Sequence, residues 1–335
     1  MGRSKLIGWN DLCMEIISDL SEDQILRAAK ALKKGHLVAF PTETVYGLGA
    51  DATNSEAIAK IYSVKNRPIN HPLIVHISAV NKLDKWVEDI PDYALDLASE
   101  FWPGPMTLLL RRSSLAKDFI TGGLDTVAVR IPQNSIALNF IQEFEKIGGS
   151  GIAAPSANRF RAISATDALA VLEELGEFCS QQDLILDAGQ CSIGLESTII
   201  DCTSVKPEIL RLGGLLKSRI EKNLGFKVKD KSQLNNKKAP GSHRKHYSPR
   251  ALVRINSIPK PFDGFIAMKS EPTPKGAVRL ASPETLEEFG QTLYSSLRLG
   301  DRLDLKVIVV ILPEESGIGE VIRDRLNRAS YLIED

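Results

Sequence analysis

Five short clusters of polar and small residues carry the binding chemistry of this sequence, and each stands beside an apolar run typical of a buried strand. The clusters occupy residues 40–49, 65–68, 126–132, 153–158 and 196–198, and a basic turn at 211–214 follows the last one. They supply hydroxyl groups, backbone that a ligand can approach closely, and the cations of lysine and arginine. Open α/β sheets bind ligands at strand ends, so the clusters predict a shared anion-binding cleft.

The cations in these clusters fit a polyanionic ligand. Lys65 and Arg67 lie where Pro68 ends a predicted helix, and Arg67 is able to grip a phosphate with two N–H groups at once. Arg130 interrupts a β-branched run, which indicates a cleft rather than a core. Taken singly, each cluster also fits a structural role, such as a helix cap, a solvated helix end or, for Arg130, an ion pair. Those alternatives stay open on the residues alone.

Common nucleotide and hydrolase motifs are missing from the sequence. It contains no GxxxxGK[ST] phosphate loop, no GxSxG nucleophile elbow and no HExxH zinc motif, and no metal site is predicted. Gly47, Gly49 and Ala52 match the dinucleotide pattern GxGxxA, but residues 41–46 separate this match from the preceding strand. The dinucleotide-binding interpretation is therefore disfavoured.

Helical and strand patterns alternate along the chain and must position these clusters. Strands are predicted at 37–40, 73–77, 107–110, 127–131, 184–186, 198–200, 251–255, 265–268 and 306–312. Helices are predicted from a capping box of Ser21 and Gln24 to Gly35, and at 55–64, 92–101, 135–146, 166–175, 283–299 and 319–330. This alternation predicts an α/β fold whose sheet is mixed in strand direction.

A basic segment divides the chain. Residues 227–250 carry eight lysines and arginines against one acid, Asp230, and few large apolar residues, which is typical of a linker. A shorter β/α alternation follows it. We expect a first domain at 15–214, a basic linker at 215–250 and a small α/β domain at 251–335.

The overall composition limits the function classes. Lys+Arg and Asp+Glu each number 42, so the formal net charge is zero and bulk charge does not favour coating nucleic acid. No stretch reaches the ~20 apolar residues of a membrane span, the N-terminal segment lacks a signal-peptide core, and the four scattered cysteines form no CxxC pair. We therefore expect a cytoplasmic protein with no membrane partner.

In their order and spacing, the clusters resemble the YrdC-like domain of the threonylcarbamoyl-AMP synthase family. The matching stretches are FPTETVYGLGADA, KNRPINHPLIVHI, WPGPMTLLL, DTVAVRIP, IAAPSAN, LDAGQCSIGLESTIID and ILRLGG, within residues 20–214. The segment APGSHRKHYSPRA at 239–251 and the tail resemble the long form of the family. The resemblance implies a twisted, open mixed sheet with a concave cleft, followed by a small Rossmann-like C-terminal α/β domain.

The resemblance also implies a reaction. Threonine and bicarbonate form a carbamate, whose oxygen attacks the α-phosphate of ATP, so that threonylcarbamoyl-AMP forms and pyrophosphate leaves. Magnesium is the implied cofactor. Partner proteins then transfer the group to the adenosine beside the anticodon of tRNA, which this chain contacts weakly or only indirectly. Such an adenylation needs cations and positioning rather than a protein nucleophile, which fits the residues present.

Individual site residues follow from the resemblance, position by position. Those that resemble the threonine pocket are Thr44, His76, Arg130 and Ser197, in which Arg130 would take the carboxylate. The implied ATP contacts are Lys65, Arg67, His71, Thr126, Ala154, Ser156, Asn158, Ser164, Arg211 and Tyr247. The implied catalytic residues are Lys65, Arg67 and Arg130. The basic linker, through Tyr247, is implied to close over the nucleotide as a lid.

Three departures from the family pattern and two alternative functions accompany this interpretation. Leu212 replaces a proline, which predicts a looser turn after Arg211, and His71 replaces a common asparagine. Residues 159–161 are bulkier and more basic than is usual, which suggests an altered cleft rim or an added contact with tRNA or a partner. The alternatives are a carbamoyltransferase, which would need metal-binding domains not seen in the sequence, and an RNA-binding module based on the basic linker.

Overall fold

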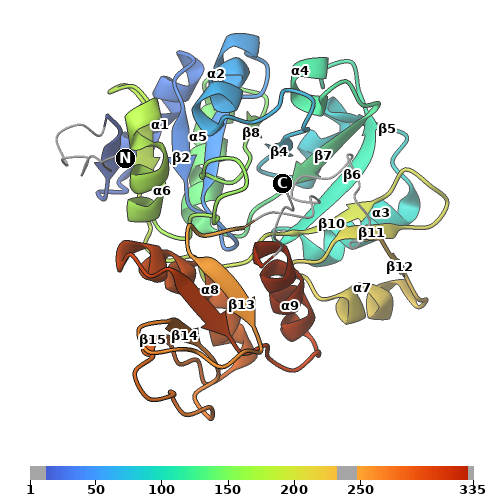
Figure 1. Ribbon diagram of the computed structural model, residues 1–335. Coiled ribbons are helices and arrows are strands. Elements are labelled where there is room, and N and C mark those ends of the chain that lie inside the picture. The colour runs from blue at the N-terminus through green and yellow to red at the C-terminus, as the bar shows by residue number, and fades with distance from the viewer. Residues whose placement is uncertain (1–12, 232–246, 331–335) are drawn as a thin grey trace.

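The computed structural model describes residues 13–231 and 247–330 (Figure 1). Residues 232–246 of the predicted basic linker therefore lie outside the described part, as do residues 331–335 of the predicted C-terminal domain. Within the described ranges the strands form one large mixed sheet and one small parallel sheet, and helices accompany both. The predicted fold class, a mixed α/β sheet followed by a small α/β domain, is confirmed.

The large sheet runs in the order β1-β9-β2-β3-β8-β4-β7-β6-β10-β11-β12, and β5 pairs with β6. Its strands are β1 (Glu15–Ile17), β2 (Val38–Phe40), β3 (Gly47–Asp51), β4 (Ile74–His76), β5 (Val87–Glu88), β6 (Met106–Arg112), β7 (Thr126–Arg130), β8 (Ile152–Ala153), β9 (Leu184–Leu186), β10 (Thr198–Asp201), β11 (Glu208–Arg211) and β12 (Lys229–Asp230). Neighbours such as β4 and β7 run parallel, whereas β6 and β7 run antiparallel. The strands predicted in this region all exist, although β1, β3, β5, β8, β11 and β12 were not predicted.

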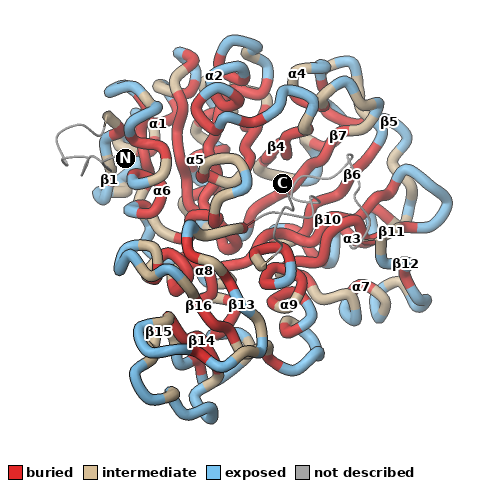
Figure 2. Tube along the Cα trace, in the orientation of Figure 1, coloured by how far each residue is buried: buried red, intermediate tan, exposed pale blue. Residues whose placement is uncertain are grey.

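Both faces of the large sheet are covered. Side chains alternate along a strand, so Val38 and Phe40 of β2 enter one core while Leu37 and Ala39 enter the other. The first core is completed by α1 (Glu22–Lys33) and α5 (Ser135–Lys146), which pack on each other. Double-sided burial explains the continuous apolar runs of the sequence, and the central strands are buried along their length (Figure 2).

The remaining helices of this region are short. They are α2 (Ser55–Lys65), α3 (Asp92–Phe101), α4 (Asp118–Thr121), α6 (Ala168–Leu175) and α7 (Lys217–Leu224), with 3-10 helices at Val80–Lys85 and Gly176–Phe178. The predicted capping box is wrong, because Ser21 precedes α1 but its hydroxyl bonds Asp19 instead of the helix backbone. In the described residues, no helix combines the length and apolar composition that crossing a bilayer demands.

The small domain is a parallel β/α unit. Its strands, in the spatial order β13-β16-β14-β15, are β13 (Leu252–Ile255), β16 (Val307–Val310), β14 (Gly264–Ile266) and β15 (Val278–Ala281). Two helices, α8 (Leu286–Arg302) and α9 (Ile318–Ala329), pack on each other, and Figure 1 shows both on the side of the small domain that faces the large domain. Gly290 of α8 brings that helix close to Leu195, near the last polar cluster of the first domain.

Two glycines of β3 explain why this strand was not predicted. Glycine has low strand propensity, yet an added Cβ at Gly49 would lie 2.9 Å from Ile152 Cγ2 and 3.1 Å from Phe40 Cε1. A Cβ at Gly47 would lie 3.2 Å from Phe40 Cζ. The GxGxxA match therefore makes room for the ring of Phe40 within the antiparallel pair β2–β3 and does not form a strand-to-helix phosphate loop.

We predict that Gly49→Val lowers the free energy of unfolding by about 3 kcal/mol or more, because its methyl groups have no space beside Phe40 and Ile152. Urea denaturation followed by circular dichroism measures this change. Lys229→Val, at an exposed position of β12, is the control and should change stability by less than ~0.5 kcal/mol. Equal stability of both variants would contradict the packing account.

Candidate functional site

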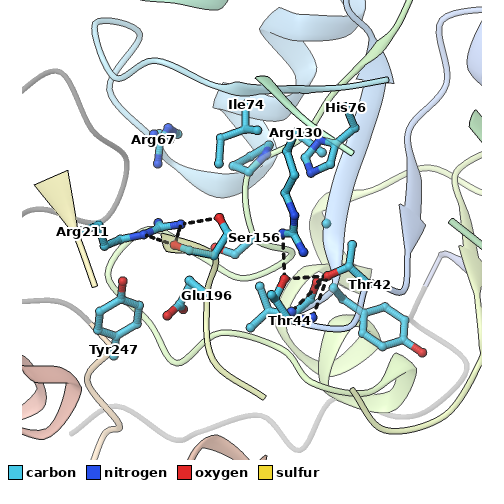
Figure 3. Close-up of a pocket in the computed structure, with 16 residues that line it drawn as sticks. Thr42, Thr44, Arg67, Ile74, His76, Arg130, Ser156, Glu196, Arg211 and Tyr247 are labelled. Atoms are coloured by element: carbon cyan, nitrogen blue, oxygen red, sulfur yellow. Dashed lines mark hydrogen bonds between the residues drawn. The ribbon is translucent and has the colours of Figure 1, made fainter. Parts of the chain in front are cut away.

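One cavity gathers residues from all five polar clusters. About 560 Å³ of its space is not filled by protein atoms, a volume that includes space open to solvent. The residues that line it are Thr42, Thr44, Val45, Tyr46, Gly47, Arg67, Ile74, His76, Arg130, Ala154, Pro155, Ser156, Glu196, Ser197, Arg211 and Tyr247 (Figure 3). Nine of the residues predicted for the site are in this set: Thr44, Arg67, His76, Arg130, Ala154, Ser156, Ser197, Arg211 and Tyr247.

Sheet register brings these residues to one edge. β4 and β7 run parallel and end side by side, with His76 opposite Arg130. β6 is antiparallel to β7 and parallel to β10, so β10 begins at the edge where β7 ends. Ser197 stands just before β10, and Arg211 ends the antiparallel strand β11 opposite Ile199. Arg130 and Arg211 thus reach the same space from different strands (Figure 3).

Arg130 is bonded to its neighbours through all three guanidinium nitrogens. Its Nη2 lies 2.7 Å from Glu43 Oε1, its Nη1 donates to Thr44 Oγ1 at 2.8 Å, and its Nε donates to the Gly104 carbonyl at 3.3 Å. Glu43 also accepts the backbone N–H of Gln133 at 3.0 Å, and the arginine and the glutamate are both buried. Three of five guanidinium N–H groups are therefore used, and two remain for a ligand.

Sequence reasoning gave no role to Glu43, which fixes the orientation of Arg130. A carboxylate inside an otherwise hydroxyl-rich cluster was the available signal. Thr42 was missed as well, and its Oγ1 lies 2.7 Å from Thr44 Oγ1 and donates to the Val45 carbonyl at 2.7 Å. The cluster at 40–49 is therefore a bonded framework that presents Thr44 and Arg130 to the cavity.

Arg67 is a buried cation without a carboxylate partner among the described residues. Its Nη2 donates to the Pro72 carbonyl at 2.9 Å, and its Nε has no bond in this part of the chain. Burial lowers the pKa of Arg67 to about 10, and the charge of Arg211 acts in the same direction, so the group remains cationic at neutral pH. A desolvated guanidinium of this kind is favourable where an anion binds beside it.

Lys65 lies behind the cavity lining. Its ammonium donates to the carbonyls of Ser156, at 2.5 Å, and of Asn158. Asn158 in turn donates from its side chain to the carbonyls of Arg159 and Ala162 at 2.8 and 2.9 Å. Burial lowers the pKa of Lys65 well below its usual value. Lys65 and Asn158 therefore shape the loop that presents Ser156.

Three other predicted residues are also outside the lining. The ring of His71 packs against Phe160 with centroids 5.2 Å apart, and Thr126 begins β7 at the end away from Arg130. The hydroxyl of Ser164, which does not line the cavity, donates to Glu196 Oε1 at 2.7 Å. Helix α6 begins after Asp167, whose side chain accepts a hydrogen bond from the backbone N–H of Ala170. The first turn of this helix is therefore capped by a side chain of the protein.

Glu196 is the carboxylate of the cavity wall, and its charge is compensated from the C-terminal domain. Tyr294 donates to its two oxygens at 3.1 and 3.0 Å, and Arg325 Nε lies 2.8 Å from Oε2. Burial would raise the pKa of Glu196, but Arg325 and Arg211 hold it below the usual value. Sequence reasoning missed Tyr294 and Arg325. Each lies about a hundred residues or more from Glu196 along the chain, which leaves no local signal.

Ser197 is fixed next to this carboxylate. Arg211 Nε and Nη2 donate to the Ser197 carbonyl at 3.1 and 2.9 Å, and Nη2 also lies 3.1 Å from its Oγ. The same Oγ lies 2.7 Å from Thr107 Oγ1. The turn after Arg211 is not loose, because the Leu212 carbonyl accepts a bond from Arg325 Nη2 at 2.6 Å.

Two aromatic residues complete the wall. Burial, followed by the charge of Arg130, lowers the pKa of His76 to about 3, so its imidazole is neutral at neutral pH. Tyr247 adopts a positive φ of 62° and stacks on Tyr294 with ring centroids 5.6 Å apart. The cavity is therefore cationic and rich in hydroxyls, and Tyr247, which stacks on Tyr294 of the second domain, forms part of its lining.

Two family models match the chain. A model described as "Telomere recombination" matches residues 30–213, and one described as "Threonylcarbamoyl-AMP synthase, C-terminal domain" matches residues 215–330. Together they span both sheets of the structure.

Full-length relatives agree with these matches. A protein of Pyrococcus abyssi named threonylcarbamoyl-AMP synthase is 40% identical over 331 residues, which cover 93% of this chain and 95% of the relative. One of Bacillus subtilis with the same name is 35% identical and covers 95% and 96%. The crystal structure of P. abyssi Sua5 complexed with L-threonine superimposes with a TM-score of 0.86 at 37% identity, covering 95% of this chain and 97% of that one. This chain accordingly belongs to the threonylcarbamoyl-AMP synthase family.

Proposed function

We propose that this protein binds ATP and L-threonine in the cavity and forms threonylcarbamoyl-AMP, for modification of tRNA beside the anticodon. The observation that carries the proposal is the convergence of three buried guanidinium groups, Arg67, Arg130 and Arg211, on one space lined with hydroxyls. A triphosphate and an amino-acid carboxylate both need such cations. Full-length similarity to a relative whose crystal structure is titled as complexed with L-threonine supports the same ligand here.

The proposed threonine pocket consists of Thr44, His76, Arg130 and Ser197. The two N–H groups of Arg130 that Glu43, Thr44 and Gly104 leave unused fit a carboxylate in a fork geometry. Neutral His76 adds no charge that would compete with Arg130 for that carboxylate. Threonine and bicarbonate form a carbamate here, and water leaves.

The proposed ATP side extends over Arg67, Arg211, Ala154, Ser156 and Tyr247. The carbamate oxygen attacks the α-phosphorus while the bond to pyrophosphate breaks, and the neighbouring cations stabilise the charge that develops on the phosphate oxygens. Lys65 and Asn158 act through the loop that they hold. An ATP contact of His71, Thr126 or Ser164 remains a proposal that the cavity lining does not support.

Magnesium and the downstream partners belong to the same proposal. The carboxylates beside the cavity, Glu43 and Glu196, are bonded to arginines, and the described residues hold no cluster of three acidic, histidine or cysteine ligands. We therefore propose that magnesium enters with the triphosphate of the substrate, as it commonly does. Transfer proteins and tRNA would receive the product in the cytoplasm.

The division of the chain at 15–214, 215–250 and 251–335 also remains a proposal. It is supported by the separate sheets, although β12 joins part of the predicted linker to the large sheet.

We predict that Arg130→Lys raises the KM for threonine about tenfold or more while the KM for ATP changes little, because lysine keeps the charge but lacks the fork. Threonine-dependent release of pyrophosphate from ATP, with bicarbonate and magnesium present, measures both constants. Lysine is preferred to alanine here because alanine would leave Glu43 buried without a partner. A normal KM for threonine in this variant would refute the pocket assignment.

We predict the reverse pattern for Arg67→Lys, namely a KM for ATP that rises about tenfold with the KM for threonine nearly unchanged. The same assay provides the measurement, and Arg302→Lys, at a half-exposed ion pair away from the cavity, is the control. Parallel losses for both substrates in Arg67→Lys would contradict a distinct phosphate side.

A further inference from the structure

Two helices of the C-terminal domain send buried side chains to the wall of the cavity. Tyr294 of α8 and Arg325 of α9 are each about 1% exposed. Both bond Glu196, which itself lines the cavity. A bond network therefore joins the second domain to a site that otherwise belongs to the first.

Arg325 connects two segments of the first domain. Its Nε lies 2.8 Å from Glu196 Oε2, and its Nη2 donates to the Leu212 carbonyl at 2.6 Å. Its guanidinium carbon also lies 5.0 Å from the centre of the Tyr247 ring. Its remaining nitrogen bonds Asp324 of the same helix, which fixes the plane of the group. One side chain thus holds the segment at 196 and the segment at 212 in register.

These two segments have little room to move independently. The Gly214 N–H donates to the Glu196 carbonyl at 2.9 Å. An added Cβ at Gly213 would lie 2.3 Å from that carbonyl oxygen and 2.4 Å from the Ser197 carbonyl carbon. Ser197 and Arg211, which line the cavity, therefore belong to one closely packed unit whose outer side Arg325 and Tyr294 bind.

A second buried contact between the domains does not reach the cavity. Arg298 of α8 is buried and pairs with Glu174 at 2.9 Å, and its Nη2 donates to the Ile163 carbonyl at 3.0 Å. Neither partner lines the cavity. Arg298 and Arg325 are thus a matched pair of buried interdomain arginines, of which only one contacts the site.

We infer that Arg325 and Tyr294 are positioning residues of the threonine pocket, acting through Glu196 on Ser197 and Arg211. The expected change in the KM for threonine rests on the proposed function. The expected change in the rigidity of the site rests on the contacts alone. The C-terminal domain supplies part of the site's rigidity, and the first domain alone lacks the bonds that Tyr294 and Arg325 make to Glu196.

The test compares Arg325→Lys and Tyr294→Phe with the control Arg298→Lys in the full-length protein. Lysine is shorter and carries its donors on one nitrogen, so it lacks the planar fork with which Arg325 bridges Glu196 and Leu212. Phenylalanine removes one hydroxyl while keeping the ring that stacks on Tyr247. We expect the KM for threonine to rise about fivefold or more in the first two variants and to stay at the wild-type value in Arg298→Lys. A smaller folded fraction would lower the apparent kcat without changing KM, so the KM separates positioning from mere destabilisation.

Hydrogen exchange gives a readout that does not depend on the reaction. We expect faster amide exchange in peptides covering 196–199 and 211–214 in Arg325→Lys and Tyr294→Phe but not in Arg298→Lys. If the wild-type protein releases no pyrophosphate while the variants show this exchange pattern, the proposed function is refuted and the positioning role is retained. Wild-type KM values together with equal exchange in all three variants would overturn the inference, and Tyr294→Phe decides it if Arg325→Lys does not fold.

Discussion

Three buried guanidinium groups around one small space impose the constraint on which the rest of this site depends. Buried cations are costly unless each is bonded, yet groups that are fully bonded have nothing left for a ligand. The protein bonds each arginine to its own atoms. Glu43 and Thr44 hold Arg130, the Pro72 carbonyl holds Arg67, and Ser197 holds Arg211. The residues that line the cavity nevertheless include these three arginines against one carboxylate, Glu196, and an anionic substrate can neutralise this excess of positive charge.

The mixed strand direction of the large sheet brings the arginines and their bonding partners together. Because β4 and β7 run parallel while β6 is antiparallel to β7 and β11 is antiparallel to β10, strand beginnings and strand ends meet at one edge. The second domain adds the last layer there, where Arg325 and Tyr294 bind the carboxylate of the wall. Domain docking and site geometry are therefore linked through these bonds.

Sequence reasoning went furthest where a local pattern carries the information. The apolar runs of β2, β4, β6, β7, β9 and β10 predicted their strands, and the polar clusters beside them predicted a common cleft. Local rules failed at β3, whose glycines have low strand propensity but fit against the ring of Phe40. They failed also at Ser21, where Asp19 competes for the hydroxyl that was expected to cap α1. The individual binding roles and the domain limits stay predictions, and the lid falls largely on residues 232–246, outside the described parts. Long-range partners such as Glu43 for Arg130, or Arg325 for Glu196, are set by tertiary packing and leave no mark in residue spacing.

The most direct measurement of the central claim is a crystal structure of this protein with L-threonine and a non-hydrolysable ATP analogue. The account predicts the threonine carboxylate within hydrogen-bonding distance of Arg130 and the phosphates facing Arg67 and Arg211. Ligand density elsewhere, or an Arg130 that turns from Glu43 and away from the cavity, would contradict it.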